Sequence, residues 1–356
     1  MTGETNQGII ELIKLGKKYR GFPALSGVTL SILEGETFVF LGPNGSGKST
    51  VLKIICGLVN PTEGNALILG SKAFNLTNSQ KRNISFLPQR TLFPPSLTVR
   101  EILSFYAALR GVPNSRIEDV TALVGLNEKA TQEKFISELS GGMTQRLALA
   151  VTCLADAQVF LLDEPTASLD PEGVLLFRSL VKKLKERRKT VIITTHLLDD
   201  ALELADRIAV LVAGELRCLI NVEELRSRIE ERSILRVHFS SISQDALDMA
   251  CSFGAALLEV GEDFCRFLCS PGQRLRVLQA LQAFHTEVTE FFVEQPSREE
   301  TFLKLSGLSS ENLSKLLSSA GFLIEFPKPR ASAKPENDKG SRSKSVKPLT
   351  NKEANR

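Results

Sequence analysis

The nine residues from 42 to 50 carry the clearest chemical pattern in the chain. They read Gly-Pro-Asn-Gly-Ser-Gly-Lys-Ser-Thr and fit the pattern G-x-x-x-x-G-K-[ST]. Residues 37–41 precede them as an apolar strand would, and residues 51–56 follow as a helix would. Glycines let the backbone N–H groups turn toward an anion, and the helix N-terminus adds its positive dipole end. The alternative is an ordinary glycine turn between a strand and a helix, and the later motifs argue against it.

These residue types suit a phosphate group with a metal ion. Lys48 can reach the β- and γ-phosphates of a nucleotide, and the Ser49 hydroxyl can ligate Mg²⁺. The residues that we expect to hold the phosphates are Gly42, Pro43, Asn44, Gly45, Ser46, Gly47, Lys48, Ser49 and Thr50.

A second pattern is an apolar strand that ends in two carboxylates. Residues 160–162 are Phe-Leu-Leu, and Asp163 and Glu164 follow at once. An Asp at the carboxyl end of a buried strand is how phosphate-loop enzymes hold Mg²⁺. Glu164 would then lie where an attacking water needs a base. The alternative is a structural strand whose end is acidic, since Asp and Glu commonly follow strands.

The third pattern is Leu-Ser-Gly-Gly-Met at residues 139–143, before an Ala/Leu-rich helix. With it the chain resembles the ATP-binding subunit of an ABC transporter over residues 9–217. The motifs that carry the resemblance, in chain order, are the phosphate loop, Gln89, the Leu-Ser-Gly-Gly signature, the pair Asp163 and Glu164, residues 168–170 (Ser-Leu-Asp), and His196. Met143 departs from the Gln that is commonest there in the family, so a side-chain role at this position is in doubt.

The resemblance implies roles for residues outside the phosphate loop. Tyr19 would stack on adenine; the alternative is a core aromatic at the edge of a strand. Gln89 would ligate Mg²⁺ and report the state of the membrane partner, although an isolated Gln in a loop is more often solvated. His196 would contact the γ-phosphate, where a lone His after a strand is usually structural. Asp170 would link two active sites across a dimer.

The resemblance also implies a mechanism shared between two cassettes. Mg²⁺ would be held by Ser49, Gln89 and, through water, Asp163, while Glu164 polarises the attacking water. Lys48, His196 and Ser140 would stabilise the transferred phosphoryl group. The signature residues Ser140, Gly141 and Gly142 would face the γ-phosphate of the opposite subunit. A chain with one loop and one signature therefore needs a second copy, or a related cassette, to complete a site.

Composition sets broader limits. The 356 residues, 42% hydrophobic and 24% charged, suggest about two soluble globular domains. A net charge of +3 makes no case for nucleic acid. No run approaches the roughly 18–20 apolar residues that span a bilayer, and no signal peptide is visible. The six cysteines lack a paired spacing, which favours reduced thiols in the cytosol.

The expected fold is an α/β phosphate-loop cassette, with a RecA-like core, a helical subdomain and a β-subdomain. A small α+β domain should follow, because strands and helices alternate as β-α-β-β-α-β, a ferredoxin-like order. The expected segments are a loose N-terminus (1–8), the ATPase domain (9–221) with its helical subdomain at about 90–155, the α+β domain (222–305), a short helical extension (306–326) and a disordered basic tail (327–356).

Two features of the later segments, a pair of cysteines and a basic tail, can each be explained either structurally or functionally. Cys265 and Cys269 share a strand face, but four residues along a strand separate them by about 13 Å, too far to share a metal. Small apolar fillers are the preferred interpretation, so Mg²⁺ is the only metal expected. The tail carries nine Lys or Arg and three Asp or Glu, a net charge of +6. It is either simply solvated or a weak anchor to anionic lipid.

Partners and location follow from the resemblance. Residues 93–101 and 295–303 look like the exporter type whose integral membrane subunit is a separate chain, which places the ATPase in the cytoplasm on the inner face of the membrane. An extracytoplasmic accessory protein is a further expected partner. Within that type the motifs are similar to ATPases of nitrous oxide reductase maturation, a copper-linked process, but drug, polysaccharide and haem-exporter-like subunits share much of them. The rivals are an ABC-type ATPase acting on ribosomes or DNA, and a degenerate cassette that only binds ATP.

Overall fold

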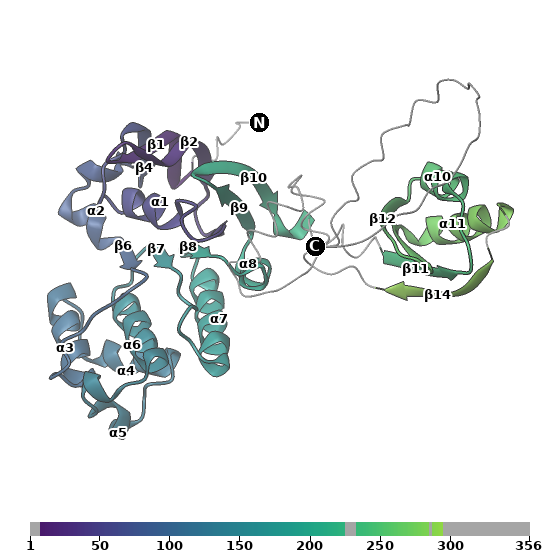
Figure 1. Ribbon diagram of the computed structural model, residues 1–356. Helices are drawn as coiled ribbons and strands as arrows, with labels where there is room; N and C mark the ends of the chain where they lie inside the picture. Colours follow the sequence, from purple (N-terminus) through teal and green to yellow (C-terminus); the bar gives the residue numbers. More distant parts are fainter. Residues whose placement is uncertain (1–7, 225–232, 285–286, 295–356) are drawn as a thin grey trace, which may run out of the picture. The chain divides into compact units, whose positions relative to one another are not determined.

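The computed structural model describes residues 8–224, 233–284 and 287–294 (Figure 1). They form three β-sheets with the helices that pack on them. Within this described part of the chain, no helix is both long and apolar enough to cross a membrane. The predicted extension at 306–326 and the predicted tail at 327–356 lie outside the described residues.

A six-stranded sheet forms the centre of the cassette. In spatial order its strands are β10 (Glu215–Asn221), β9 (Arg207–Val212), β3 (Thr37–Leu41), β8 (Thr190–Thr195), β7 (Val159–Asp163) and β6 (Ile84–Leu87). All neighbouring pairs are parallel except β10 with β9. The carboxyl ends of β3, β8, β7 and β6 therefore meet at one edge, and the residues that follow them carry the predicted site.

Both faces of this sheet are covered, as continuous apolar strands predict. Phe38 and Phe40 of β3 point into a core shared with α1 (Lys48–Ile55). Val39 and Leu41 point to the other face, where the core includes residues of α7 (Pro171–Glu186) and α8 (Leu198–Leu204). The side chains of one strand thus fix the positions of helices on opposite faces, and α1 is the helix that begins at the phosphate loop.

An antiparallel sheet completes the core on the side of α1. In spatial order its strands are β2 (Phe22–Ile32), β1 (Ile10–Tyr19), β4 (Glu63–Ile68) and β5 (Ser71–Lys72). A two-residue turn, Arg20 and Gly21, joins β1 to β2, and both residues have positive φ. The right-handed twist of two paired strands favours such turns. This hairpin brings Ala24 to the phosphate loop.

The segment between β6 and β7 is mainly helical, as its sequence predicts, and it begins with a capped helix. Its helices are α3 (Val99–Arg110), α4 (Ser115–Leu123), α5 (Lys129–Gln132) and α6 (Gly141–Leu154), while the short α2 (Asn78–Arg82) precedes β6. The Thr98 hydroxyl accepts the Glu101 N–H, and the Glu101 carboxylate accepts the Thr98 N–H, a reciprocal cap at the start of α3. Gly111, with φ near +68°, ends that helix.

Residues 233–284 and 287–294 form an antiparallel sheet with a core of its own. The elements are β11 (Ser233–Phe239), α10 (Gln244–Ser252), β12 (Ala256–Val260), β13 (Phe264–Cys269), α11 (Pro271–Ala283) and β14 (Val288–Glu294). The strand order β12-β13-β11-β14 is that of a ferredoxin-like unit, which confirms the predicted β-α-β-β-α-β pattern. Cys265 and Cys269 are buried in its core with Phe267, and burial raises the pKa of the Cys265 thiol to about 12.

Candidate functional site

The phosphate loop joins β3 to α1 and surrounds the N-terminal end of that helix. Its backbone needs glycine at Gly47, where φ is +103° and a Cβ atom would lie 2.6 Å from the Ala24 carbonyl oxygen. The loop borders a cleft of about 240 Å³. The cleft is lined by Ala24, Asn44, Gly45, Ser46, Gly47, Lys48, Ser49, Thr50, Gln89 and Glu164. Gln89, which follows β6, and Glu164, which follows β7, therefore reach the loop as the sequence predicts.

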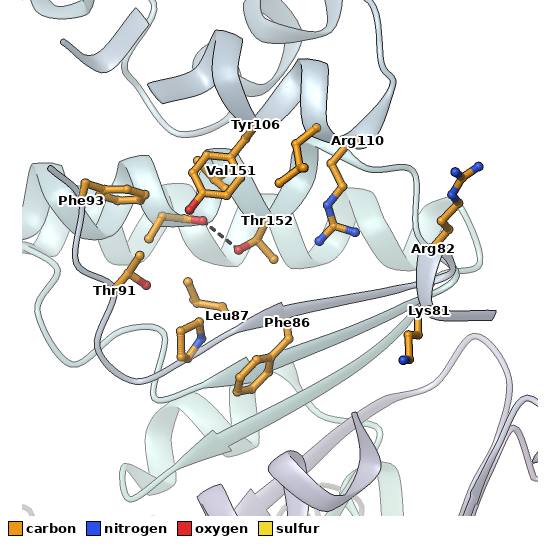
Figure 2. A pocket seen from close by; sticks show the side chains of 13 residues that line it. Lys81, Arg82, Phe86, Leu87, Thr91, Phe93, Tyr106, Arg110, Val151 and Thr152 are labelled. Carbon is orange, nitrogen blue, oxygen red and sulfur yellow. Dashed lines mark hydrogen bonds between the residues drawn. The ribbon is translucent and has the colours of Figure 1, made fainter. Parts of the chain in front are cut away.

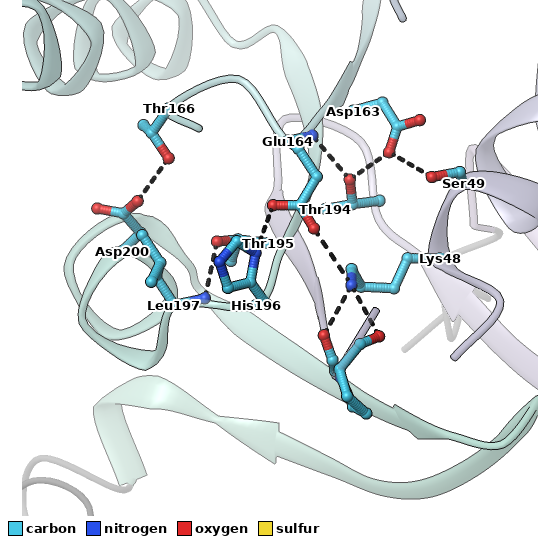
Figure 3. Close-up of polar contacts among 12 residues, drawn as sticks. Lys48, Ser49, Asp163, Glu164, Thr166, Thr194, Thr195, His196, Leu197 and Asp200 are labelled. Atoms are coloured by element: carbon cyan, nitrogen blue, oxygen red, sulfur yellow. Dashed lines mark hydrogen bonds and ion pairs between the residues drawn. The ribbon is translucent and has the colours of Figure 1, made fainter. Parts of the chain in front are cut away.

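Lys48 is buried at the centre of this cleft (Figure 3). Its ammonium donates hydrogen bonds to the carbonyl oxygens of Gly42, at 2.7 Å, and Pro43, at 3.2 Å. The same nitrogen lies 3.2 Å from Glu164 Oε1, and both side chains are about 5% exposed. A buried cation held by carbonyl dipoles and one carboxylate is suited to attract a phosphate group.

Asp163 ends β7 beside the first turn of α1. Its Oδ1 accepts hydrogen bonds from the Ser49 hydroxyl, at 2.9 Å, and from the Thr194 hydroxyl, at 2.6 Å (Figure 3). The expected Mg²⁺ fits these residues, because Ser49 and Asp163 offer adjacent oxygen atoms and Gln89 lines the same cleft. Mg²⁺ prefers oxygen ligands, takes few of them from protein, and keeps several waters.

Glu164 has a backbone conformation that non-glycine residues adopt rarely. Its φ is +49°, in the left-handed region, and its N–H donates to the Thr194 hydroxyl at 2.9 Å. Such strain persists only where the surroundings fix it, and it is common at active sites. Here it directs the carboxylate into the cleft, where Oε1 faces Lys48 and Oε2 lies 2.9 Å from His196 Nδ1.

His196 follows β8 and is half-buried. Its Nδ1 contacts the Glu164 carboxylate, which the Lys48 ammonium also contacts. Glu164 therefore lies between the imidazole and the ammonium (Figure 3). The structure thus brings together the phosphate loop, Gln89, Asp163, Glu164 and His196 from the ends of four neighbouring strands. This is the set that can bind a triphosphate with a metal ion and place a base beside its terminal phosphate.

The signature forms a second group, which does not line this cleft. Ser140 caps α6, and its hydroxyl accepts the Met143 N–H at 3.2 Å. Gly141 and Gly142 are the first residues of that helix, and a Cβ atom at Gly142 would come within 3.3 Å of the Ser168 carbonyl oxygen. The signature therefore packs against the loop that ends at Asp170.

Asp170 belongs to that second group. It caps α7 by accepting the Gly173 N–H at 3.0 Å, and it accepts a hydrogen bond from Arg146 of α6 at 2.7 Å. The Arg146 hydrogen bond, followed by that of Gly173, holds the pKa of Asp170 below its usual value, so this carboxyl is ionised at neutral pH. The N-terminus of α6 thus lies beside the loop that ends at Asp170, and Arg146 of α6 pairs with that carboxylate.

Tyr19 lies at the end of β1 and is 44% exposed. It is not among the residues that line the cleft, although Ala24 of the adjoining strand is. The Lys17 ammonium lies 5.1 Å from the centre of its ring. Its partner on the neighbouring strand, Phe22, is 78% exposed. The turn residues Arg20 and Gly21 are the signal that could have paired the two aromatics.

The sequence analysis also missed Thr194, whose hydroxyl joins Asp163 to the backbone of Glu164. The available signal was a pair of threonines, Thr194 and Thr195, at the end of an otherwise apolar strand. Hydroxyls at the carboxyl end of a buried strand are rarely left without a partner.

The fold and the two groups of residues define an ATP-binding cassette, and comparisons with known proteins agree. A family model described as ABC transporter matches residues 25–167. The linearmycin resistance ATP-binding protein LnrL of Bacillus subtilis is 30% identical over 308 residues, 84% of this chain and 98% of its own length. The daunorubicin/doxorubicin resistance ATP-binding protein DrrA of Streptomyces peucetius is 30% identical over 86% of this chain and 94% of its own.

A solved dimeric ABC transporter cassette, MJ0796, superposes with a TM-score of 0.56 at 31% identity, over 60% of this chain and 98% of that one. The mouse ATP-binding cassette sub-family A member 7 is 31% identical over 85% of this chain, which spans 15% of that protein's length. The chain belongs to the ABC transporter family, as an ATP-hydrolysing subunit. The expected link to copper-enzyme maturation finds no support in these relatives.

Proposed function

We propose that this chain hydrolyses ATP only in a head-to-tail pair of cassettes, formed by two copies or by one copy with a related cassette. The observation that carries the proposal is the separation of the two groups of residues. The cleft holds the phosphate loop and Glu164, whereas Ser140 and Asp170 belong to another surface. The N-terminus of α6 is a second anion-binding end, and it would meet the γ-phosphate held by the partner's cleft.

Each residue of the cleft has a distinct role in this proposal. The loop amides and Lys48 bind the β- and γ-phosphates. Tyr19, which is exposed and does not line the cleft, would stack on adenine. Ser49 and Gln89, with Asp163 through water, would hold Mg²⁺, whose charge offsets that of the phosphates. Glu164 takes the proton of the attacking water, because its carboxylate is fixed between Lys48 and His196.

A groove beside the cleft supports docking of a separate membrane subunit. It has a volume of about 460 Å³ and lies between β6, α3 and α6 (Figure 2). Phe86, Phe93, Tyr106 and Leu109 give it an apolar lining. The basic residues at the groove are Lys81, Arg82 and Arg110. An amphipathic segment with an acidic end would fit such a surface.

The residues that line the groove and those that line the nucleotide cleft are adjacent in the sequence after β6. Leu87 and Pro88 line the groove, and the next residue, Gln89, lines the cleft. A shift of the docked segment would therefore move a Mg²⁺ ligand directly. We infer a chain that is cytoplasmic and bound to the inner face of the membrane through this contact. Similarity to two drug-resistance subunits supports an exporter, and an extracytoplasmic accessory protein is the further partner that we propose.

The variant Glu164→Gln tests the proposed chemistry. It keeps the shape of the side chain and removes the base, so we expect ATP binding and an ATP-dependent dimer, with turnover lowered by a factor on the order of 100 or more. The measurements are nucleotide binding, size-exclusion chromatography with ATP, and phosphate release. Normal hydrolysis by this variant would remove Glu164 from the role of base.

The same variant, tagged and purified from detergent-solubilised membranes, tests the partner. Mass spectrometry should find an integral membrane protein in stoichiometric amount. Adding Leu109→Glu in the groove should release it, whereas Leu175→Glu on α7 should not; the two leucines are 68% and 65% exposed and make a matched pair. Copurification with ribosomes or DNA instead would overturn the transporter role and favour a soluble ABC-type ATPase.

A further inference from the structure

Asp200 is a buried carboxylate that the proposed chemistry does not use. It lies on α8, four residues after His196, and only 5% of it is exposed. Its Oδ2 accepts the hydroxyl of Thr166 at 2.7 Å (Figure 3), and its Oδ1 accepts a hydrogen bond from the Arg178 guanidinium at 3.1 Å. A buried carboxylate is costly unless it is paired and hydrogen-bonded, and here both oxygens have partners.

Thr166 gives this contact its significance, because it follows Glu164 by two residues. The loop after Glu164 is held from a second side as well. The Gln145 side chain of α6 donates a hydrogen bond to the Pro165 carbonyl oxygen at 3.0 Å, and Gln145 is itself buried. The backbone that carries Glu164 in its left-handed conformation is thus fixed by the helix that begins at the signature and by the helix that follows His196.

The contacts close a ring around the two residues. Glu164 leads through Pro165 to Thr166, whose hydroxyl binds Asp200; α8 leads from Asp200 back to His196, and His196 meets the Glu164 carboxylate at 2.9 Å. The positions of Glu164 and His196 are therefore coupled. A shift of α8 would move His196 through the chain and Glu164 through the Asp200–Thr166 hydrogen bond.

Arg178 extends the ring to a third element. It lies on α7, the helix that Asp170 caps, and it binds the Asp200 oxygen that Thr166 leaves free. One carboxylate therefore connects the loop after Glu164, the helix after His196 and the helix that begins at Asp170. These are the segments that carry the proposed base, the proposed γ-phosphate contact and the residue at the dimer face.

We propose that Asp200 is a positioning residue for hydrolysis, which acts through the Thr166 hydroxyl on Glu164 and through α8 on His196. The proposal rests on the role of Glu164 proposed above. Binding of ATP depends on the phosphate loop and Lys48. The hydrogen bonds of Asp200 do not reach the loop, and Lys48 contacts this network only through the Glu164 carboxylate. The turnover step depends on where the Glu164 carboxylate lies relative to the attacking water, and a displacement of about 1 Å there is costly.

The decisive variant is Thr166→Val, which removes one hydroxyl with little change in shape and leaves the Asp200–Arg178 pair in place. In the full-length chain we expect kcat to fall on the order of 10- to 100-fold, as misplacement of a reacting group does. KM for ATP and the affinity for a fluorescent ATP analogue should stay within about twofold, because ground-state binding is unchanged. Thr166→Ser restores the hydroxyl and should restore kcat.

A second variant and a control complete the test. Asp200→Asn keeps an acceptor for Thr166 but removes the charge that holds Arg178, so its kcat should lie between those of the wild type and Thr166→Val. Glu203→Gln alters an exposed carboxylate of the same helix and should leave kcat unchanged. Thermal unfolding of every variant is measured alongside, so that turnover is compared well below each transition.

The outcomes separate this proposal from the one on which it rests. Turnover within about twofold of wild type in Thr166→Val would overturn the positioning role. So would a parallel fall of kcat and nucleotide affinity that Thr166→Ser does not reverse, since that indicates general loosening. If Glu164→Gln, assayed in the same series, hydrolyses ATP normally, then the base assignment fails instead.

Discussion

At the scale of single residues, one hydroxyl connects the two carboxylates of the site. Thr194 Oγ1 donates to Asp163 and accepts the N–H of Glu164, so it sets the distance between the proposed metal ligand and the proposed base. Thr194 is completely buried, which leaves no water to replace the hydroxyl. Buried polar groups that lose a partner are costly, and that cost can be measured.

Thr194→Val should therefore lower the free energy of unfolding by about 1–3 kcal/mol, the cost of leaving a buried polar group without its partner. The Asp163 carboxylate loses a donor, whereas the Glu164 N–H keeps a contact with the Thr194 carbonyl oxygen. Chemical denaturation measures the change. Thr194→Ser serves as the control, and equal stability of the Val and Ser variants would show that the hydroxyl contributes nothing.

The chemical identities in the site were predictable, but their partners were not. Lys48, Ser49, Asp163, Glu164 and His196 stand in motifs whose spacing is local. Thr194 lies about 30 residues from the carboxylates that it joins, and only the pairing of β7 with β8 brings them together. A contact of that kind depends on strand order, which no local pattern contains.

At the scale of elements, the start of α3 controls one wall of the proposed docking groove. Tyr106, Leu109 and Arg110 of this helix line the groove, and the reciprocal cap of Thr98 and Glu101 begins it. Hydrogen bonds from the Thr98 N–H and then from its hydroxyl lower the pKa of the Glu101 carboxyl below its usual value of 4.5. The ionised form is therefore the one that the folded helix favours.

The sign of the pH dependence follows. The contribution of Glu101 is present above its unfolded pKa and is lost as the pH falls through the lower pKa of the folded state. Glu101→Gln should thus unfold at a lower temperature than wild type at pH 7, and the difference should disappear in acid. Circular dichroism melts at several pH values measure it. Thr98→Ser keeps both donors and should behave as wild type; a pH-independent difference for Glu101→Gln would contradict the cap.

Element boundaries show where local patterns stop being sufficient. In the second helix of the small domain, apolar residues at helical spacing run from Leu275 onward, but α11 already starts at Pro271. The Gln273 side chain accepts the Ser270 N–H there at 2.8 Å, and proline is favoured in a first turn. The spacing of apolar residues indicates which face of a helix is buried, whereas capping residues indicate where the helix begins. The first buried residue therefore need not be the first residue of the helix.

At the scale of the whole molecule, strand order is what sequence could not supply. The alternation of strands and helices predicts a parallel sheet but not the order of its strands. β3 lies between β8 and β9, which follow it by about 150 residues or more in the sequence. Its side chains pack into one core on each face of the sheet, and this packing depends on the whole fold. For the small domain, the sequence of strands and helices along the chain was predictable. The arrangement of its four strands in the sheet is the one that a β-α-β-β-α-β unit commonly adopts. The domain boundaries at 221/222 and 305/306 remain predictions.

The separation of the cleft from the signature surface has a consequence in genetics. A copy with Lys48→Met keeps an intact signature, and a copy with Ser140→Arg keeps an intact cleft. Each alone should be inactive, but coexpressed they form mixed pairs in which one of the two sites has both intact halves, so ATPase activity should reappear. Lys48→Met with Glu164→Gln should not complement, because both lesions fall in the cleft. If the first mixture stays inactive, a site shared between two copies is refuted. If activity returns, the two alleles show intragenic complementation.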